Sequence, residues 1–291
     1  MNVQNSLYKI RSVRGCLKAS LELYGSNLRA IFRCSWLPAV IFGIGASVVT
    51  FCQSIADPTH FSLQSVALTA VGGIIVIAAL IWLRATIVSQ LSGNGMRQSV
   101  FKLFKQTMLI CFLFTLFLLT TAVSYHLWVA PRQTAAQPSL PIFFIWLILL
   151  LVVFVSVSLP LCYSSMKYYL EPKQKIKDAW CKNYIGGIRF EGYIFLTCLL
   201  IFIISAICYA FVSMPSLIIS TANKANQFSM FLGDPNGVTP MFYCLMFISN
   251  FICYFILSYV IIWSEMVLYY VYGSLEARRA VFKEIKRVED N

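Results

Sequence analysis

Charged residues are scarce in this sequence. Asp, Glu, Lys and Arg make up only 12% of its 291 residues, whereas 59% are hydrophobic and the mean hydropathy is +0.76. A soluble domain carries about a quarter charged residues, so this composition excludes an ordinary water-soluble fold. Because charge is costly in hydrocarbon, a chain with so little of it is typical of a membrane protein.

The residues from which active sites are usually built are also scarce. The sequence has two histidines, His60 and His126, and neither belongs to an H-E-x-x-H pattern. Its ten cysteines contain no C-x-x-C pair, which disfavours a metal site, and we interpret them as small hydrophobic residues. A phosphate-binding G-x-x-x-x-G-K-[ST] loop is also absent. We therefore expect no cofactor and no metal. The same absences disfavour an enzyme, although a catalyst built from Ser, Cys or Tyr alone would leave no such pattern.

Long hydrophobic runs dominate what is present. Six stretches are long and apolar enough to cross about 30 Å of hydrocarbon as helices. They lie at residues 37–56, 64–83, 107–127, 140–162, 193–213 and 242–263. A β-barrel would show alternating segments of about ten residues, and the run at 147–159 does not alternate. The sequence predicts one all-α membrane domain with six transmembrane helices in three hairpins, an N-terminal segment at 1–36 and a tail at 264–291.

Lys and Arg are distributed unevenly between the two sides of these spans. Segments 1–36, 84–106, 163–192 and 264–291 hold 21 of them, and the remaining three loops hold 2. The positive-inside rule then predicts cytoplasmic N- and C-termini. The sequence shows no cleavable signal peptide and no N-glycosylation sequon, and we expect a bacterial inner (cytoplasmic) membrane. The net charge of +12 is therefore no signal of nucleic-acid binding, and the expected partner is anionic lipid of the inner leaflet.

The basic segments are amphipathic. In residues 10–33, hydrophobic and basic residues fall on opposite sides of a helical wheel, which predicts a helix in the inner headgroup plane. Segments 97–106 and 173–192 show the same pattern before the third and fifth spans, and the tail predicts a fourth basic helix with Glu276 and Arg279 spaced for an ion pair. Either three related hairpins or ordinary basic anchors would explain this pattern. The residues expected to contact lipid headgroups are Arg11, Lys18, Arg29, Arg33, Lys102 and Lys105.

Few polar residues lie in the predicted spans, and each allows two interpretations. Glu265, at the cytoplasmic end of the last span, lies at the same depth as Arg84, so we predict an ion pair, with a proton or cation relay as the alternative. Asn250 predicts a hydrogen bond between helices rather than a substrate ligand. Gly72 and Gly73 predict close helix packing rather than an unwound binding site.

The external loop FLGDPNGVTP, residues 231–240, contains Asp234. Asp-Pro-Asn-Gly fits a type I turn, with Asp first, Pro second and Gly fourth. A cation site would need further oxygen ligands, and the only other external acid is Asp57. We interpret Asp234 as a turn residue that directs the chain into the last span. Cys52 and Cys244 also lie near the outer face, and their spacing leaves open whether they form a disulfide.

Three motifs in the second half of the chain resemble an uncharacterised group of bacterial six-span membrane proteins. They are YIGGIRFEGYIFL at 184–196, GDPNG at 233–237 and YYVYGSLE at 269–276. This chain has Phe190, Glu191 and Gly192 where the group has His-Trp-Gly. The layout is also similar to the six-helix membrane domains of some bacterial glycerophosphodiester phosphodiesterases, but no phosphodiesterase catalytic residues are present. The resemblance implies a six-span fold and no particular activity, because fold alone does not give function.

Two functions fit these observations. The first is a non-enzymatic, membrane-embedded interaction or assembly subunit whose basic segments contact anionic lipid, because ionisable residues within the spans are so few. The alternative is a transporter or lipid-handling protein for an apolar or amphipathic cargo, which would explain the many Phe, Tyr and small residues of the spans. An apolar crevice between the second and sixth spans, or a lipid retained through purification, would favour the cargo function, and a tightly packed bundle would favour the subunit.

Overall fold

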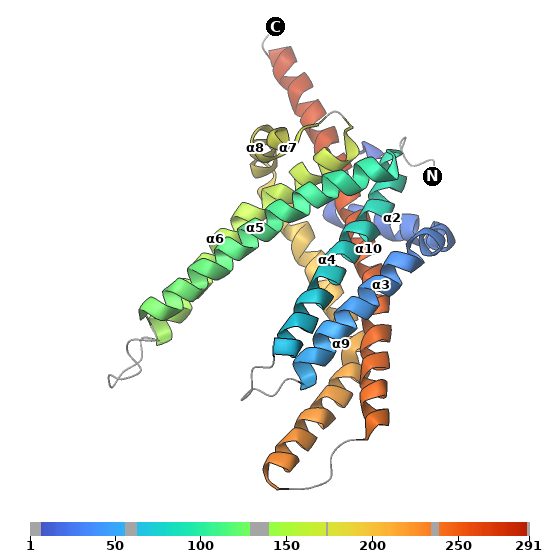
Figure 1. Ribbon diagram of the computed structural model, residues 1–291. Helices are drawn as coiled ribbons and strands as arrows, with labels where there is room; N and C mark the ends of the chain where they lie inside the picture. Colours follow the sequence, from blue (N-terminus) through green and yellow to red (C-terminus); the bar gives the residue numbers. More distant parts are fainter. Residues whose placement is uncertain (1–6, 56–62, 129–139, 173, 234–238, 290–291) are drawn as a thin grey trace. The chain divides into compact units, whose positions relative to one another are not determined.

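The computed structural model describes residues 7–55, 63–128, 140–172, 174–233 and 239–289. In this part of the chain all regular secondary structure is α-helical, which confirms the all-α prediction (Figure 1). The helices are α2 (Val13–Ser26), α3 (Leu28–Ile55), α4 (Leu63–Ser92), α5 (Met96–Trp128), α6 (Leu140–Leu170), α7 (Ile176–Trp180), α8 (Lys182–Ile188), α9 (Glu191–Phe231) and α10 (Pro240–Glu289).

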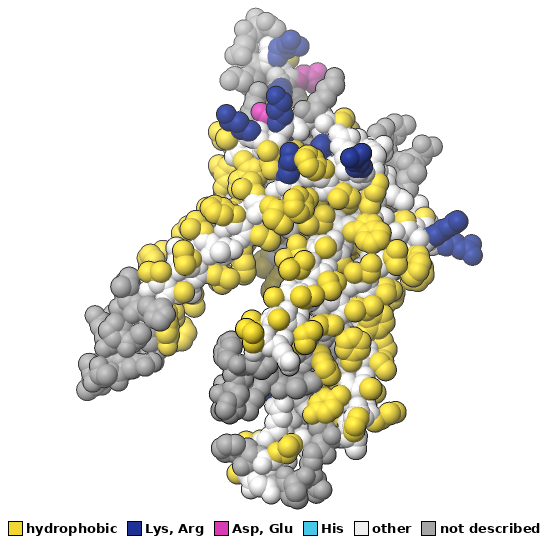
Figure 2. Space-filling model, in the orientation of Figure 1, with side chains coloured by type: hydrophobic (Ala, Val, Ile, Leu, Met, Phe, Trp, Pro, Cys, Tyr) yellow, Lys and Arg dark blue, Asp and Glu magenta, His cyan; other side chains and the backbone are white. Residues whose placement is uncertain are grey.

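Six of these helices are long and apolar enough to cross a membrane: α3, α4, α5, α6, α9 and α10. They follow the order of the six predicted spans, so the chain is a multi-pass membrane protein. A helix satisfies its peptide groups internally, which is necessary where no water is available. Figure 2 shows that hydrophobic side chains cover most of the visible surface of the long helices, as contact with lipid requires.

The helices extend beyond the hydrophobic runs. The basic segment at 97–106 forms the first turns of α5 rather than a separate interfacial helix, which corrects the sequence analysis. The tail helix is likewise the continuation of α10, which runs for 50 residues. Neither junction contains a proline, and a continuous helix keeps each peptide group hydrogen-bonded as the chain leaves the hydrocarbon.

The N-terminal amphipathic segment forms a separate helix, α2. The Ser12 side chain caps its start by accepting a hydrogen bond from the Gly15 amide at 3.2 Å. At its end, the Asn27 side-chain amide donates to the Leu23 carbonyl at 3.0 Å. Because α3 begins at Leu28, the predicted single helix at 10–33 is divided between α2 and the first turns of α3.

The chain forms two compact units, which are described separately below. Unit 1 comprises Met1–Ile10, Leu91–Thr197 and Val271–Asn291, and unit 2 comprises Arg11–Gln90 and Cys198–Tyr270. Unit 1 therefore contains α5 to α8 and the last part of α10, and unit 2 contains α2, α3 and most of α4, α9 and α10.

Glycines allow close helix packing in unit 2. A Cβ atom added to Gly45 of α3 would lie 2.9 Å from Ile75 Cγ2, and one added to Gly72 of α4 would lie 2.8 Å from Val49 Cγ2. The close packing predicted at Gly72 is therefore confirmed. The prediction is wrong for Gly73, because an added Cβ there would have no heavy atom within 4 Å.

In unit 1, α7 and α8 pack on α6. Gly187 of α8 lies so close to α6 that an added Cβ would be 2.8 Å from the Pro160 carbonyl oxygen. The Tyr184 hydroxyl of α8 donates to the Val157 carbonyl at 3.1 Å. Burial and the nearby Glu191 carboxylate raise the pKa of Tyr184 further above its ordinary value.

The adjacent glycines of α4 provide a matched test of this packing. Gly72→Ala should lower the free energy of unfolding by about 1–3 kcal/mol, because Val49 is β-branched and cannot turn away from the new methyl group. Gly73→Ala should leave it unchanged or raise it by up to about 1 kcal/mol, since alanine favours helix and the space is open. Thermal unfolding in detergent measures both variants. Equal stability of the two would contradict the packing described here.

Candidate functional site

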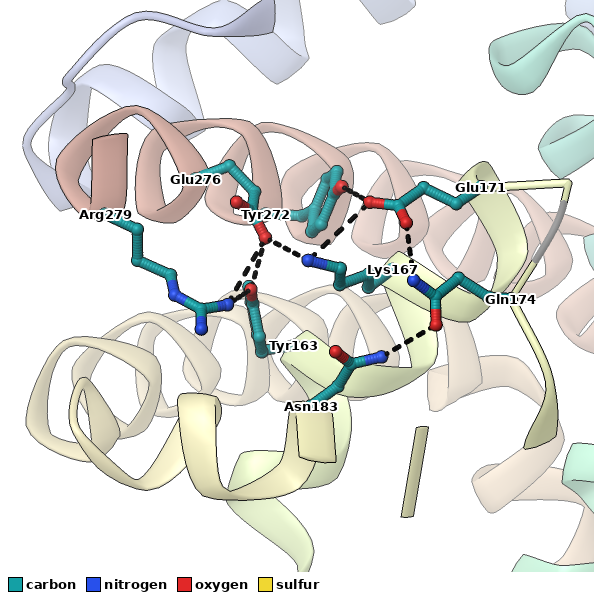
Figure 3. Close-up of polar contacts among 8 residues, drawn as sticks. All are labelled: Tyr163, Lys167, Glu171, Gln174, Asn183, Tyr272, Glu276 and Arg279. Carbon is teal, nitrogen blue, oxygen red and sulfur yellow. Dashed lines mark hydrogen bonds and ion pairs between the residues drawn. The ribbon is translucent and has the colours of Figure 1, made fainter. Parts of the chain in front are cut away.

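A cluster of polar side chains lies in unit 1, where α6 ends (Figure 3). Tyr163 and Lys167 are four residues apart on α6, and Tyr272 and Glu276 are four residues apart on α10, so each pair lies on one helix face. Eight residues make up this polar cluster: Tyr163, Lys167, Glu171, Gln174, Asn183, Tyr272, Glu276 and Arg279.

Glu276 is the centre of one half of the polar cluster. Its Oε1 atom lies 2.8 Å from Lys167 Nζ and 3.6 Å from Arg279 Nη1, and it accepts a hydrogen bond from the Tyr163 hydroxyl. The Arg279 guanidinium also donates to the Tyr163 oxygen. The ion pair between Glu276 and Arg279 that the sequence predicts is therefore present. Two cations and a hydroxyl around one half-buried carboxylate connect α6 to α10.

Glu171 is the centre of the other half. Its Oε1 atom accepts from the Tyr272 hydroxyl at 3.1 Å and lies 3.7 Å from Lys167 Nζ, and its Oε2 atom accepts from Gln174 Nε2 at 2.7 Å. Asn183 of α8 donates to Gln174 Oε1 at 3.2 Å. Lys167 is thus shared by both carboxylates, and the polar cluster joins α6, α8 and α10.

The charges of the polar cluster are balanced. Its two carboxylates, Glu171 and Glu276, have two cations, Lys167 and Arg279, as partners. A catalytic acid or base must reach a substrate with its proton-transfer atom, whereas both carboxylates are already bonded to several internal donors. Within the described residues no group of three or more His, Cys, Asp or Glu is suited to hold a metal ion. The chemistry that this arrangement supports is the fixing of three helices.

Lys102 does not occupy the place that the sequence analysis expects. It is only 6% exposed, and its ammonium donates to the backbone carbonyls of Tyr168 at 2.7 Å and Glu171 at 2.6 Å. These carbonyls lie at the C-terminal end of α6, where backbone acceptors have no intrahelical donor and a positive charge is favourable. Lys102 therefore caps α6 from α5, and its predicted contact with a lipid headgroup is wrong.

The other residues expected at lipid headgroups differ from Lys102. Arg29, Arg33 and Lys105 are exposed, as is Lys18, whose side chain is 77% exposed. Arg11 is half-buried, with its guanidinium carbon 4.9 Å from the centre of the Tyr270 ring. Contact of these five residues with lipid stays a prediction.

The predicted pair of Arg84 and Glu265 is present in unit 2. Arg84 Nε donates to Glu265 Oε1 at 2.6 Å, and the two side chains are 24% and 7% exposed. The bond connects α4 to α10. The second oxygen, Oε2, is buried without a hydrogen-bond partner among the residues that the structure describes. The relay alternative for Glu265 therefore stays open beside its structural role.

The structure describes some of the other polar residues that the sequence singles out, and not others. Asn250 is 1% exposed, and its side-chain oxygen accepts a hydrogen bond from Ser216 of α9, which confirms the predicted bond between helices. Cys52 and Cys244 are free thiols. Asp234 lies outside the described residues, as does the side chain of His126.

Most residues of the polar cluster are not predicted from the sequence to form a site. Its residues lie in segments that the charge pattern assigns to the cytoplasmic flanks, so they are expected to contact water or lipid. The sequence nevertheless contains a signal, because polar side chains follow each other at intervals of four positions. They are Tyr163, Lys167 and Glu171 in one segment, and Tyr272 and Glu276 in the other. This spacing marks a polar helix face but does not identify the face that it contacts.

The pair of Arg84 and Glu265 is tested by a double-mutant cycle. Arg84→Gln and Glu265→Gln should each lower the free energy of unfolding by about 1–3 kcal/mol, because each leaves a largely buried charge without its partner. The double variant should lose less than the sum of the two single losses. Chemical denaturation in detergent measures all three variants.

The exposed pair of Lys18 and Glu22, 3.9 Å apart on α2, serves as the matched control. Lys18→Gln and Glu22→Gln should change the free energy of unfolding by less than about 0.5 kcal/mol. Additive losses at Arg84 and Glu265 would show that the two side chains do not stabilise each other.

Removal of Glu276 tests the polar cluster. Glu276→Ala should loosen the end of α10, because Lys167 and Arg279 lose their shared carboxylate. Amide hydrogen exchange over residues 271–285 should accelerate on the order of tenfold or more, which corresponds to the loss of a charge-assisted hydrogen bond. Glu284→Ala, at an exposed position of the same helix, should not change this exchange. Equal exchange in both variants would mean that the polar cluster does not hold α10.

Comparison of this chain with protein-family models, with curated proteins and with solved structures finds no match in any of the three.

Proposed function

We propose that this protein is a non-enzymatic, membrane-embedded interaction or assembly subunit. The observation that carries the proposal is the polar cluster, in which both carboxylates are bonded to several internal donors. Such an arrangement stabilises a fixed surface at the end of α6, α8 and α10 and offers no free acid or base to a substrate. A rigid surface of this kind suits the binding of another protein, because little side-chain order is lost on association.

The proposal includes a location and an orientation. The excess of Lys and Arg in alternate flanks supports a bacterial inner membrane protein with both termini in the cytoplasm. The exposed basic residues Lys18, Arg29, Arg33 and Lys105 would then lie near anionic lipid of the inner leaflet. The three motifs at 184–196, 233–237 and 269–276 support membership of the uncharacterised six-span group, and two residues of the last motif, Tyr272 and Glu276, belong to the polar cluster.

A second candidate function is the handling of a lipid or another amphipathic cargo. It is favoured by an apolar groove of about 500 Å³ in unit 1, between α5 and α7. We call this the α5–α7 groove. A volume of this size is within the range of pockets that bind small molecules.

Gentle extraction in native lipid, followed by mass spectrometry of everything that remains bound, tests the proposed function. We expect a protein partner that copurifies at constant stoichiometry, and no such partner with a second six-span protein of the same membrane prepared in parallel. A lipid bound at constant stoichiometry with no protein partner would overturn the subunit proposal and favour the cargo function.

A further inference from the structure

We propose that the α5–α7 groove is a binding site for one anionic glycerophospholipid of the bilayer, with its acyl chain along α5 and its phosphate between Lys105 and Lys177. This inference deepens the proposed function, on which it rests for the placement of α5 in the membrane and of its basic end near anionic lipid. It adds the site, the residues and the chemical class of the ligand. Three features support it: the shape of the apolar wall, the placement of two exposed ammonium groups, and the rigidity of the groove.

The apolar wall has the form that an acyl chain requires. Phe104, Met108 and Phe112 follow each other at intervals of four residues, so they form a stripe along one face of α5. From Phe104 to Phe112 the stripe rises by about 12 Å along the helix, which is close to the depth of one leaflet at about 15 Å. Their side chains are 47%, 45% and 65% exposed. These residues belong to a candidate membrane span, so phospholipid is the molecule that this surface meets.

Two basic side chains line the groove together with this stripe. Lys105 of α5 and Lys177 of α7 both line the groove, and both are exposed. Lys102, one turn before Lys105, instead donates to backbone carbonyls at the end of α6. The two neighbouring lysines of α5 therefore make different contacts. Two ammonium groups beside an apolar stripe complement a phosphate joined to an acyl chain. A zwitterionic headgroup would bring its own cation to the same place and gain less.

The groove is held in place by hydrogen bonds from its own wall. Trp180 lines the groove on α7, and its indole nitrogen donates to Gln106 Oε1 at 3.2 Å. Gln106 Nε2 donates in turn to Ser165 Oγ at 2.8 Å. This chain of bonds connects α7, α5 and α6 within unit 1, so the distance between the two lysine-bearing helices is fixed before a lipid binds. Tryptophan is also the side chain most typical of the membrane interface.

The test uses the whole protein reconstituted into vesicles of equimolar phosphatidylglycerol and phosphatidylethanolamine. After mild detergent extraction, native mass spectrometry measures which lipid stays bound and in what number. We expect one phosphatidylglycerol per chain. Lys105→Gln combined with Lys177→Gln should lower this retention on the order of tenfold or more, because each basic residue near the phosphate adds to the affinity.

A matched control separates a defined site from general surface charge. Arg97→Gln combined with Lys175→Gln removes the same charge from exposed positions on or next to the same two helices but outside the groove. This double variant should retain phosphatidylglycerol as the unchanged protein does. Met108→Trp should lower retention without any change in charge, since the larger side chain narrows the groove. It also keeps the proposal testable if the lysine variants do not fold.

Three results would overturn the site. They are retention of both lipids in equal amount, equal loss in the lysine variant and its control, and a protein segment bound in the groove in place of lipid. Failure of the site can be distinguished from failure of the proposed function. If the variant with both Lys105 and Lys177 replaced keeps its lipid, and the protein partner copurifies with the unchanged protein, only the groove proposal fails. If the lipid is lost as expected and no partner is found, the subunit proposal fails alone.

Discussion

Hydrocarbon cannot hydrogen-bond to a peptide group, and this constraint explains why the helices are so long and so continuous. The hydrophobic runs end well before the helices do. In α5 the basic residues are added to the start of the spanning helix, and in α10 the helix continues from the last span to Glu289. A break within the hydrocarbon would leave carbonyl and amide groups without donors and acceptors. Continuous helices avoid that cost.

The same constraint acts on side chains that carry charge. Glu265 is paired with Arg84, Glu276 with Lys167 and Arg279, and Lys102 with two carbonyls at the end of α6. Apart from the pair of Glu276 and Arg279, which both lie on α10, each of these contacts joins different helices, so the pairing of charge also fixes the packing of each unit. These charged groups therefore serve as structural connections within each unit.

Lys102 and Lys105 illustrate the limit of reasoning from a charge pattern. Both lie on the first turns of α5, both belong to the same amphipathic segment, and the sequence assigns both to lipid headgroups. Three residues correspond to a rotation of about 300° around a helix, so the two side chains lie about 60° apart. That difference is enough for one ammonium to reach the end of α6 while the other stays at the rim of the groove.

The sequence by itself determines that the chain crosses a membrane six times as helices, because six long uncharged runs allow no other solvent and no other backbone structure. It also predicts contacts in which one chemical group has few possible partners, as with Glu265 and Arg84 or the buried amide of Asn250. Only the tertiary structure decides which polar face contacts which helix. Tyr163, Lys167, Tyr272 and Glu276 show helical spacing in the sequence, but their contact depends on the way α6 and α10 pack, and this packing comes from the sum of many weak apolar contacts.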